Sequence, residues 1–322
     1  MERTESVLVP EFEDIRKAHK RINGLIHRTP VLSSESINII TDCSIYFKCE
    51  NLQKVGAFKF RGASNAIACL TDEEAAGGVA THSSGNHAQA LALAAKMRGI
   101  KAFIVMPSNS PQVKKDAVAG YGAEILYCEP TLEARESTLN KVVENTGAVF
   151  IHPYNNFNVI CGQGTAAVEL LEETEQLDIV MAPVGGGGLL SGTSIAVKGL
   201  SPETIVIAGE PEGADDAFRS LRDGFIHPSV NPKTIADGLL TSLSELTFAV
   251  ISQKVDDIVT VSDEYTIKAM KLVWERMKIV IEPSAAVCLG AIMQHGERFR
   301  SNRIGIILSG GNVDLGKLPW QK

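Results

Sequence analysis

Short apolar segments typical of buried strands alternate with longer segments of helical periodicity along almost the whole chain. The expected strands cover residues 44–49, 79–82, 101–106, 123–127, 149–151, 179–184, 205–208, 258–261 and 303–308. The expected helices cover residues 10–23, 62–70, 88–97, 131–145, 163–173, 189–198, 268–277 and 283–293, with another beginning near Pro111. Strands that take turns with helices indicate an α/β fold, because helices are the usual connections between parallel strands.

A run of four glycines stands between an apolar strand and an apolar helix. It consists of Gly185, Gly186, Gly187 and Gly188. Because these residues have no side chains, an anion can approach the backbone, and the following helix adds N–H groups and the positive end of its dipole. We therefore predict a phosphate site. A flexible linker is the alternative, but linkers are not expected directly between two apolar elements. The run lacks the Gly-Lys-Ser/Thr ending of a P-loop.

Lys59 is the charged residue with the most unusual surroundings. It stands between Phe58 and Phe60, behind a turn at Gly56 and just inside a predicted helix. Apolar neighbours disfavour the ammonium and lower the pKa of a lysine, which makes its amine available as a Schiff-base nucleophile. For a lysine considered by itself, the exposed face of an amphipathic helix is the alternative.

A small polar turn follows the expected strand at residues 79–82 and precedes a segment of strong helix propensity. It consists of Ser83, Ser84, Gly85, Asn86 and His87. A turn in this position places unpaired backbone N–H groups beside two hydroxyls and an amide, so it suits a carboxylate or a phosphate. An ordinary helix N-cap made by Ser84 or Asn86 explains the same residues and stays open.

An acidic loop follows the expected strand at residues 205–208. Glu210, Asp216 and a backbone carbonyl between them could ligate a hard divalent cation, because such ions prefer oxygen ligands. A solvated acidic loop that caps the next helix is the alternative. The sequence leaves both open.

The composition of the chain indicates which kind of protein it is and which kinds of partner are not expected. The 322 residues are 44% hydrophobic and 21% charged, which is typical of a compact chain with a large core. The net charge is −7 and no dense run of Lys and Arg occurs, so nucleic acid is not expected as a partner. Residues 1–6 lack the layout of a signal peptide and no apolar run approaches a membrane span, so we expect a cytoplasmic protein without a membrane partner.

The cysteines and histidines show no metal-binding spacing. The six cysteines are Cys43, Cys49, Cys69, Cys128, Cys161 and Cys288. They form no C-x-x-C pair, so we expect reduced, mostly buried side chains. The histidines are equally dispersed, and His82, His87 and His152 are interpreted as structural.

Four motifs in order carry a family resemblance: the aromatic-flanked Lys59, the polar turn at residues 83–87, the glycine run, and Ser309-Gly310-Gly311-Asn312. The chain resembles the pyridoxal-phosphate (PLP) enzymes of the tryptophan-synthase-β class (fold type II), on the branch of the serine racemases and serine/threonine dehydratases. The similarity runs nearly end to end and includes residues 272–278 and 281–283.

This resemblance implies two open, twisted, mostly parallel sheets flanked by helices. It also implies a large cofactor-binding domain formed by residues 1–75 and 154–322. A small mobile substrate domain would be formed by residues 76–153.

The resemblance also implies a role for each matching residue. Lys59 would carry PLP as a Schiff base, with Phe58 against the ring, and Asn86 would bond the ring hydroxyl. Ser309 would face the pyridine nitrogen, and the glycines at 185–188 would hold the phosphate. The substrate carboxylate would bind the turn formed by Ser83, Ser84, Gly85, Asn86 and His87.

For the reaction, the resemblance places Ser84 on the ring face opposite Lys59, so that one group removes the α-proton and the other returns one. The expected activity is serine racemisation with concurrent loss of the β-hydroxyl to give pyruvate and ammonia. Ser84 favours racemisation, because dehydratases of this branch commonly carry alanine there. A threonine or 3-hydroxyaspartate dehydratase stays open, as does a colourless nucleotide-binding protein of another class. The loop at residues 152–156 lacks the serines of aspartate-racemising relatives, which disfavours aspartate as substrate.

Effector sites are implied as well. Glu210, the Ala214 carbonyl and Asp216 would surround Mg²⁺ or Ca²⁺. ATP would bind between the subunits of a homodimer as an allosteric effector, at positions matching Lys54, Gln89, Tyr121, Lys278 and Asn312. Val55 and residues 34–36 depart from the pattern of the animal enzymes.

Overall fold

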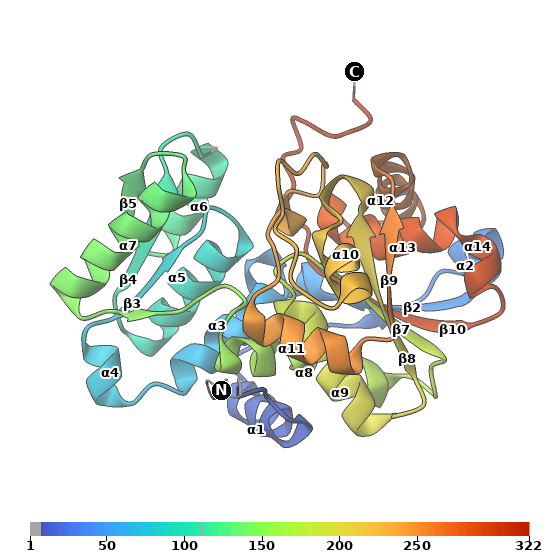
Figure 1. Cartoon of the computed structure of the whole chain (residues 1–322), viewed down its shortest axis with the longest axis horizontal. Coiled ribbons are helices and arrows are strands. Elements are labelled where there is room, and N and C mark those ends of the chain that lie inside the picture. The colour runs from blue at the N-terminus through green and yellow to red at the C-terminus, as the bar shows by residue number, and fades with distance from the viewer. Residues whose placement is uncertain (1–7, 111, 322) are drawn as a thin grey trace.

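The computed structural model describes residues 8–110 and 112–321, which form two lobes, each built around one sheet (Figure 1). In spatial order, the larger sheet contains β1 (Val31–Leu32), β2 (Ser44–Cys49), β10 (Arg303–Leu308), β7 (Ile179–Pro183), β8 (Ile205–Pro211) and β9 (Asp257–Val261). The smaller sheet contains β5 (Glu124–Cys128), β4 (Ala102–Pro107), β3 (Val79–His82) and β6 (Val149–Phe150). Strand β1 runs antiparallel to β2, and the other neighbouring strands are parallel. The expected α/β fold with two mostly parallel sheets is confirmed.

Helices connect these strands. The α-helices are α1 (Phe12–Ile22), α2 (Glu35–Thr41), α3 (Lys59–Ala68), α4 (Asp72–Ala76), α5 (Asn86–Arg98), α6 (Gln112–Gly120), α7 (Leu132–Thr146), α8 (Phe157–Glu173), α9 (Gly188–Leu200), α10 (Asp216–Asp223), α11 (Glu245–Lys254), α12 (Asp263–Met277), α13 (Pro283–Gln294) and α14 (Gly296–Phe299). Single turns of 3₁₀-helix are η1 (Glu50–Leu52), η2 (Lys54–Gly56), η3 (Glu212–Ala214) and η4 (Asp237–Leu239). In the described residues, no helix has the length and apolar character needed to cross a bilayer.

Helix α8 is longer than the sequence pattern predicts, because it begins at Phe157 rather than near Gln163. The Asn156 side chain caps it by accepting a hydrogen bond from the Val159 N–H at 3.0 Å. Two glycines, at 162 and 164, weaken the helical signal of this segment in the sequence. Both are used for packing, as a methyl group at either position would lie 2.6 Å from the backbone of a neighbouring helix.

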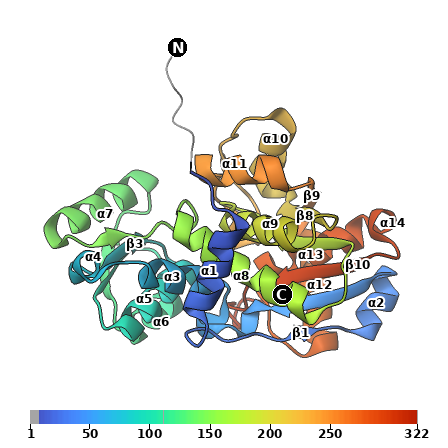
Figure 2. The same cartoon turned by 90° about the horizontal axis from the view of Figure 1, so that it is seen from below.

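The larger sheet is covered by helices on both faces. One apolar cluster contains residues of α1, α8, α9 and α11, and a second contains residues of α2, α12 and α13. Every residue of β7 is buried, as expected for a parallel strand with helices on both sides. In the smaller lobe, α5 and α6 pack on one face of the sheet and α7 packs on the other, while α3 packs against α5 and α8 at the junction with the larger lobe. Figure 2 shows α1 and α8 near the junction of the lobes.

Three strands of the larger sheet end at the same edge. In the parallel register, Cys49 at the end of β2 lies opposite Leu308 at the end of β10, and β7 ends beside them at Pro183. The segments that follow these strands are the turn before Lys59, the segment at residues 309–312 and the glycine loop. The carboxyl ends of parallel strands are the usual place for ligands in open α/β sheets. The fold therefore gathers the separate sequence motifs at one edge.

Candidate active site

Lys59 is the first residue of α3 and lies at the junction of the lobes. Its Nζ donates a hydrogen bond to the carbonyl of Pro153 at 2.9 Å and lies 5.1 Å from the centre of the Phe58 ring. The Phe58 N–H donates to the carbonyl of Ser309 at 3.0 Å, so the start of α3 is attached to the end of β10. Lys59 is thus partly buried at the sheet edge, and the alternative of a solvated surface lysine is wrong.

The surroundings of Lys59 lower the pKa of its amine. Burial disfavours the ammonium and outweighs the attraction of the Glu282 carboxylate, so the pKa falls to about 8. A substantial fraction of the amine is therefore neutral slightly above neutral pH. A neutral amine can act as a nucleophile or a base.

Glu282 is a site residue that the sequence analysis missed. Its carboxylate accepts hydrogen bonds from Asn86 Nδ2 at 2.9 Å and from the Asn312 N–H at 3.2 Å. Burial raises the pKa of Glu282 to about 7. A methyl group on Gly310 would lie 2.6 Å from Glu282 Oε1, which explains the glycine there. The available signal was an acid directly before the proline that begins α13, within the similar segment at residues 281–283.

The polar turn before α5 keeps its ligand-binding groups available. The N-cap of α5 is Gly85, and no side chain caps the helix, so the alternative of an N-cap made by Ser84 or Asn86 is wrong. The Ser83 hydroxyl accepts from the Gly85 N–H at 3.3 Å, while Asn86 is directed toward Glu282 and Asn312. The Ser84 hydroxyl is therefore not committed to capping the helix.

Two histidines, His87 in the turn and His152 near it, are held neutral. His87 Nε2 contacts the Ile151 carbonyl at 3.1 Å, and burial followed by the charge of Lys59 lowers the pKa of His87 to about 3. His152 Nδ1 accepts from the N–H groups of Tyr154 and Asn155, and burial lowers the pKa of His152 to about 4. These contacts with the backbone fit the structural role expected for both rings.

The glycine loop is buried and tightly covered. A methyl group on Gly186 would lie 2.4 Å from the Tyr154 ring, and one on Gly185 would lie 2.8 Å from Leu239 Cα. Gly187 has a φ of +85°, which favours glycine. The first N–H groups of α9, which begins at Gly188, have no partners within the helix. The loop is therefore a fixed structure whose N–H donors lack partners within the helix, and the alternative of a flexible linker is wrong.

The acidic loop contains two buried carboxylates, Glu210 and Asp216, that form no ion pair with the described residues. Glu210 accepts from the N–H groups of Ala217 and Phe218 at 2.8 and 2.7 Å, so it caps α10, although it is buried rather than solvated. Burial raises the pKa of Glu210 to about 9 and that of Asp216 to about 6. Asp216 Oδ2 is buried and has no hydrogen-bond partner among the described residues. Within residues 8–110 and 112–321, no three His, Cys, Asp or Glu side chains form a metal-binding group.

The residues expected to bind ATP lie around η1, η2 and α5. Lys54 Nζ donates to the carbonyl of Leu25 at 2.6 Å, and Asn312 Nδ2 donates to the carbonyl of Val55 at 2.7 Å. Gln89 is buried on α5, which packs against η2. Tyr121 packs against the apolar cluster that includes α5, and Lys278 ends α12. Asn312 therefore links this region to the Lys59 site through its bond to Asn86.

Val55 holds a strained backbone conformation beside this region. Its φ of +57° is unusual for a β-branched residue. The bond from Asn312 to the Val55 carbonyl helps to hold it.

Arg135 is a second residue that the sequence analysis missed. It lies in the first turn of α7. Burial lowers the pKa of His82, the charge of Glu136 opposes this effect, and the smaller effect of Arg135 adds to it. Arg135 Nε is buried and meets no hydrogen-bond acceptor in the described part of the chain. An unpaired guanidinium N–H near the end of β3 is suited to an anionic group. No local pattern in the sequence distinguishes it from other helix arginines.

Known proteins resemble the chain over nearly its whole length. A family model described as "Pyridoxal-phosphate dependent enzyme" matches residues 22–310. The β-hydroxyaspartate dehydratase of Paracoccus denitrificans is 52% identical over 97% of this chain and 99% of its own length. The serine racemase of Dictyostelium discoideum is 52% identical over 95% of this chain and 96% of its own. The structure of maize serine racemase matches with a TM-score of 0.94 at 46% identity, covering 96% of this chain and 95% of the maize chain. The chain belongs to the pyridoxal-phosphate dependent enzymes.

Proposed function

We propose that the chain is a PLP-dependent serine racemase, which interconverts L- and D-serine and also converts serine to pyruvate and ammonia by losing the β-hydroxyl. The observation that carries the proposal is the pairing of a lysine of lowered pKa with a polar turn whose Ser84 hydroxyl is uncommitted. Family membership excludes a protein that uses the glycine loop for a nucleotide alone.

The residues at the sheet edge fit PLP. The bare backbone at residues 185–188 and the start of α9 suit its phosphate, and the Lys59 amine suits its aldehyde. We assign the pyridine nitrogen to Ser309 and the ring hydroxyl to Asn86, which Glu282 and Asn312 orient. When bound, PLP withdraws electrons from the α-carbon of an amino acid and makes its proton acidic.

The chain supplies two proton-carrying groups for inversion. Neutral Lys59 Nζ accepts the α-proton of one enantiomer, and Ser84 Oγ serves the opposite face. The effect of the Lys59 charge on the pKa of His87 supports a place for the amine beside the first turn of α5. The turn at residues 83–87 binds the substrate carboxylate through hydroxyls and N–H groups.

Product analysis tests this function. The purified protein is given L-serine, L-threonine and L-threo-3-hydroxyaspartate, and D-amino acids and keto acids are measured separately. For Ser84→Ala we expect D-serine formation to fall about 100-fold while pyruvate formation changes far less. Ser83→Ala is the matched control, because it removes a neighbouring hydroxyl and should lower both products together. Equal loss of both products in Ser84→Ala would exclude its role in proton return.

Arg135 favours a second candidate, 3-hydroxyaspartate dehydratase. A β-carboxylate would provide the acceptor that buried Arg135 Nε lacks in the described part of the chain, whereas serine has no such group. The Paracoccus relative is named for this activity. On this reading, Arg135→Ala lowers kcat/KM for hydroxyaspartate by about 100-fold and that for serine much less. An equal decrease for the two substrates would remove the support from Arg135.

A cation site and an ATP site complete the proposal. The unpaired Asp216 Oδ2 and the raised pKa values of Glu210 and Asp216 support Mg²⁺ or Ca²⁺ bound with the Ala214 carbonyl, because a cation would neutralise these carboxylates. For ATP, the support is the connection from Asn312 to Asn86 in the site. Activity measured with and without each effector tests both.

We also propose a homodimer and two domains. Leu52 and Val280 are exposed neighbours, since Asn51 Nδ2 bonds the Val280 carbonyl, and they provide an apolar contact surface. The placement of the smaller sheet within residues 79–150 supports a small domain at residues 76–153 and a large one at 1–75 and 154–322.

A cytoplasmic location is supported by six free cysteines. Sedimentation equilibrium tests the dimer.

A further inference from the structure

Helix α8 contacts both parts of the chain that would hold PLP. On one side its Gly162 meets α3, where an added methyl group would lie 2.6 Å from Gly62 Cα. On the other side its Gly164 meets Gly192 of α9, the helix that begins at the glycine loop. The position of Lys59 relative to the phosphate cradle therefore depends on how α3 is seated on α8.

Arg61, in the first turn of α3 after Lys59, forms a polar connection to α8. Its Nη1 and Nη2 donate to the two carboxylate oxygens of Glu169 at 2.8 and 2.7 Å, and Nη1 also donates to Thr165 Oγ1 at 3.1 Å. Its Nε and Nη2 donate to the two oxygens of Glu50, in η1, at 2.7 and 2.8 Å. All five guanidinium N–H groups are used.

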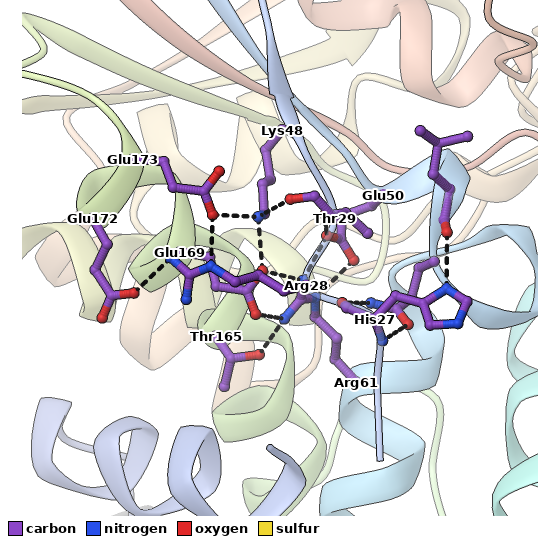
Figure 3. Close-up of polar contacts among 12 residues, drawn as sticks. His27, Arg28, Thr29, Lys48, Glu50, Arg61, Thr165, Glu169, Glu172 and Glu173 are labelled. Atoms are coloured by element: carbon purple, nitrogen blue, oxygen red, sulfur yellow. Dashed lines mark hydrogen bonds and ion pairs between the residues drawn. The ribbon is translucent and has the colours of Figure 1, made fainter. Parts of the chain in front are cut away.

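The centre of the cluster around Arg61 is buried, and the partly exposed ion pairs of Arg28 with Glu172 and Glu173 lie at its edge (Figure 3). Lys48 Nζ lies 2.7 Å from Glu169 Oε2, so two buried cations, Arg61 and Lys48, face two buried anions, Glu50 and Glu169. Thr29 Oγ1 donates to Glu50 Oε1 at 2.6 Å. Lys48 belongs to β2 and does not lie on the helix of Lys59. The two cations therefore provide a matched pair for comparison.

We propose that Arg61 is a positioning residue, which holds the first turn of α3 between η1 and α8 and so directs the Lys59 amine toward the PLP site. The planar fork of the guanidinium is required, because two carboxylates on different elements are each bound by two parallel hydrogen bonds. Another cation would preserve the charge balance but not this geometry. The inference rests on the proposed attachment of PLP to Lys59.

The test compares Arg61→Lys with Lys48→Met. For Arg61→Lys we expect weaker binding of PLP, a pKa of the Lys59 amine closer to that of an ordinary lysine, and a fall in kcat of about 100-fold with little change in KM. The amine is titrated in PLP-free protein by pH-dependent chemical labelling and mass spectrometry of the Lys59 peptide. PLP affinity is measured by absorbance titration.

Lys48→Met removes an equally buried cation from the same cluster, so we expect lower stability with unchanged PLP affinity and unchanged Lys59 titration. Equal changes in PLP affinity and Lys59 titration for the two variants, or none in Arg61→Lys, would overturn the inference. If Arg61→Lys does not fold, Glu50→Gln replaces it, since it keeps the side-chain shape and removes one acceptor of the fork. A Lys59→Ala protein that still forms a borohydride-reducible bond would instead refute the attachment itself.

Discussion

Lys59 and Arg61 are two cations on the same turn of α3, and their surroundings are opposite. Arg61 is fully buried and donates five hydrogen bonds, four of them to the carboxylates of Glu50 and Glu169. Burial alone would lower the pKa of Arg61, but these carboxylates raise it. Lys59 donates to the carbonyl of Pro153, and burial lowers its pKa to about 8.

The difference between the two cations shows which one has a structural role and which one can react. A buried cation matched by carboxylates stays charged and holds elements together. A cation that lacks this compensation loses its proton more easily, and its amine becomes chemically useful. The chain places the two only two positions apart, so the rigid cluster of Arg61 supports the reactive amine of Lys59.

The largest effect is expected from removing the reactive member. Lys59→Ala removes both the amine that binds PLP and the proposed base, so we expect a colourless protein and a loss of turnover of at least about 1,000-fold. The visible absorbance of bound PLP and assays of D-serine and pyruvate would measure these losses. A Lys59→Ala protein with normal colour and turnover would contradict the comparison.

Removing Arg61, the structural cation of the pair, should lower the stability of the protein. Arg61→Met leaves the carboxylates of Glu50 and Glu169 buried with only Lys48 to balance them. We expect the free energy of unfolding to fall by about 3–5 kcal/mol, the usual range for breaking a buried ion pair. Urea unfolding followed by circular dichroism would show it. The exposed pair of Arg16 and Glu13 is the control, and Arg16→Met should change stability by less than about 1 kcal/mol.

The reactive region was easier to predict from the sequence than the structural one. Lys59, the polar turn and the glycine loop are each local patterns, because neighbours in the chain create their special backbone or apolar surroundings. Arg61 was not singled out, since its partners Glu50 and Glu169 lie in other elements and no spacing connects them. Glu282 was missed for the same reason, as its contacts with Asn86 and Asn312 exist only after both lobes have folded.

The pattern of strands and helices was predictable because apolar periodicity reports burial directly. The beginning of α8 was not predictable. Its glycines have low helix propensity in the sequence, although in the structure they permit close packing against α3 and α9. The alternative of an N-cap at Ser84 or Asn86 could not be decided from the sequence either. Which residue caps a helix depends on backbone conformation, and the structure uses Gly85.

A smaller effect should appear in the pH dependence of the PLP-free protein. The pKa of Lys59 is about 8 when folded and 10.5 in the reference state, so between these values the unfolded chain binds more protons. The contribution of Lys59 to stability therefore rises with pH across this window. Lys59→Met removes the rise and should stabilise the PLP-free protein at pH 7 by about 3 kcal/mol. The free energies of unfolding of the original protein and of Lys59→Met, measured at pH 7 and pH 10, would show the difference. If both proteins changed equally in stability between these pH values, the pKa of Lys59 would be that of an ordinary lysine.

The smallest effect concerns the acidic loop, where burial disfavours the charged form of carboxyl groups as it disfavours the charged form of Lys59. Burial raises the pKa of Glu210 to about 9 and that of Asp216 to about 6. The stability that each carboxyl group contributes is therefore complete below its pKa in the unfolded chain. It is lost as pH rises through the folded pKa, at about 6 for Asp216 and about 9 for Glu210. Mg²⁺ or Ca²⁺ at ten times its Kd should restore about 1.4 kcal/mol, with a larger effect at pH 8.5 than at pH 5.5. Asp216→Asn should abolish the shift in Tm, whereas Asp223→Asn on the same helix, whose carboxylate pairs with Arg222, should retain it. A shift that survives Asp216→Asn would place the cation elsewhere in the protein, and the raised pKa values of Glu210 and Asp216 would then not reflect a cation site.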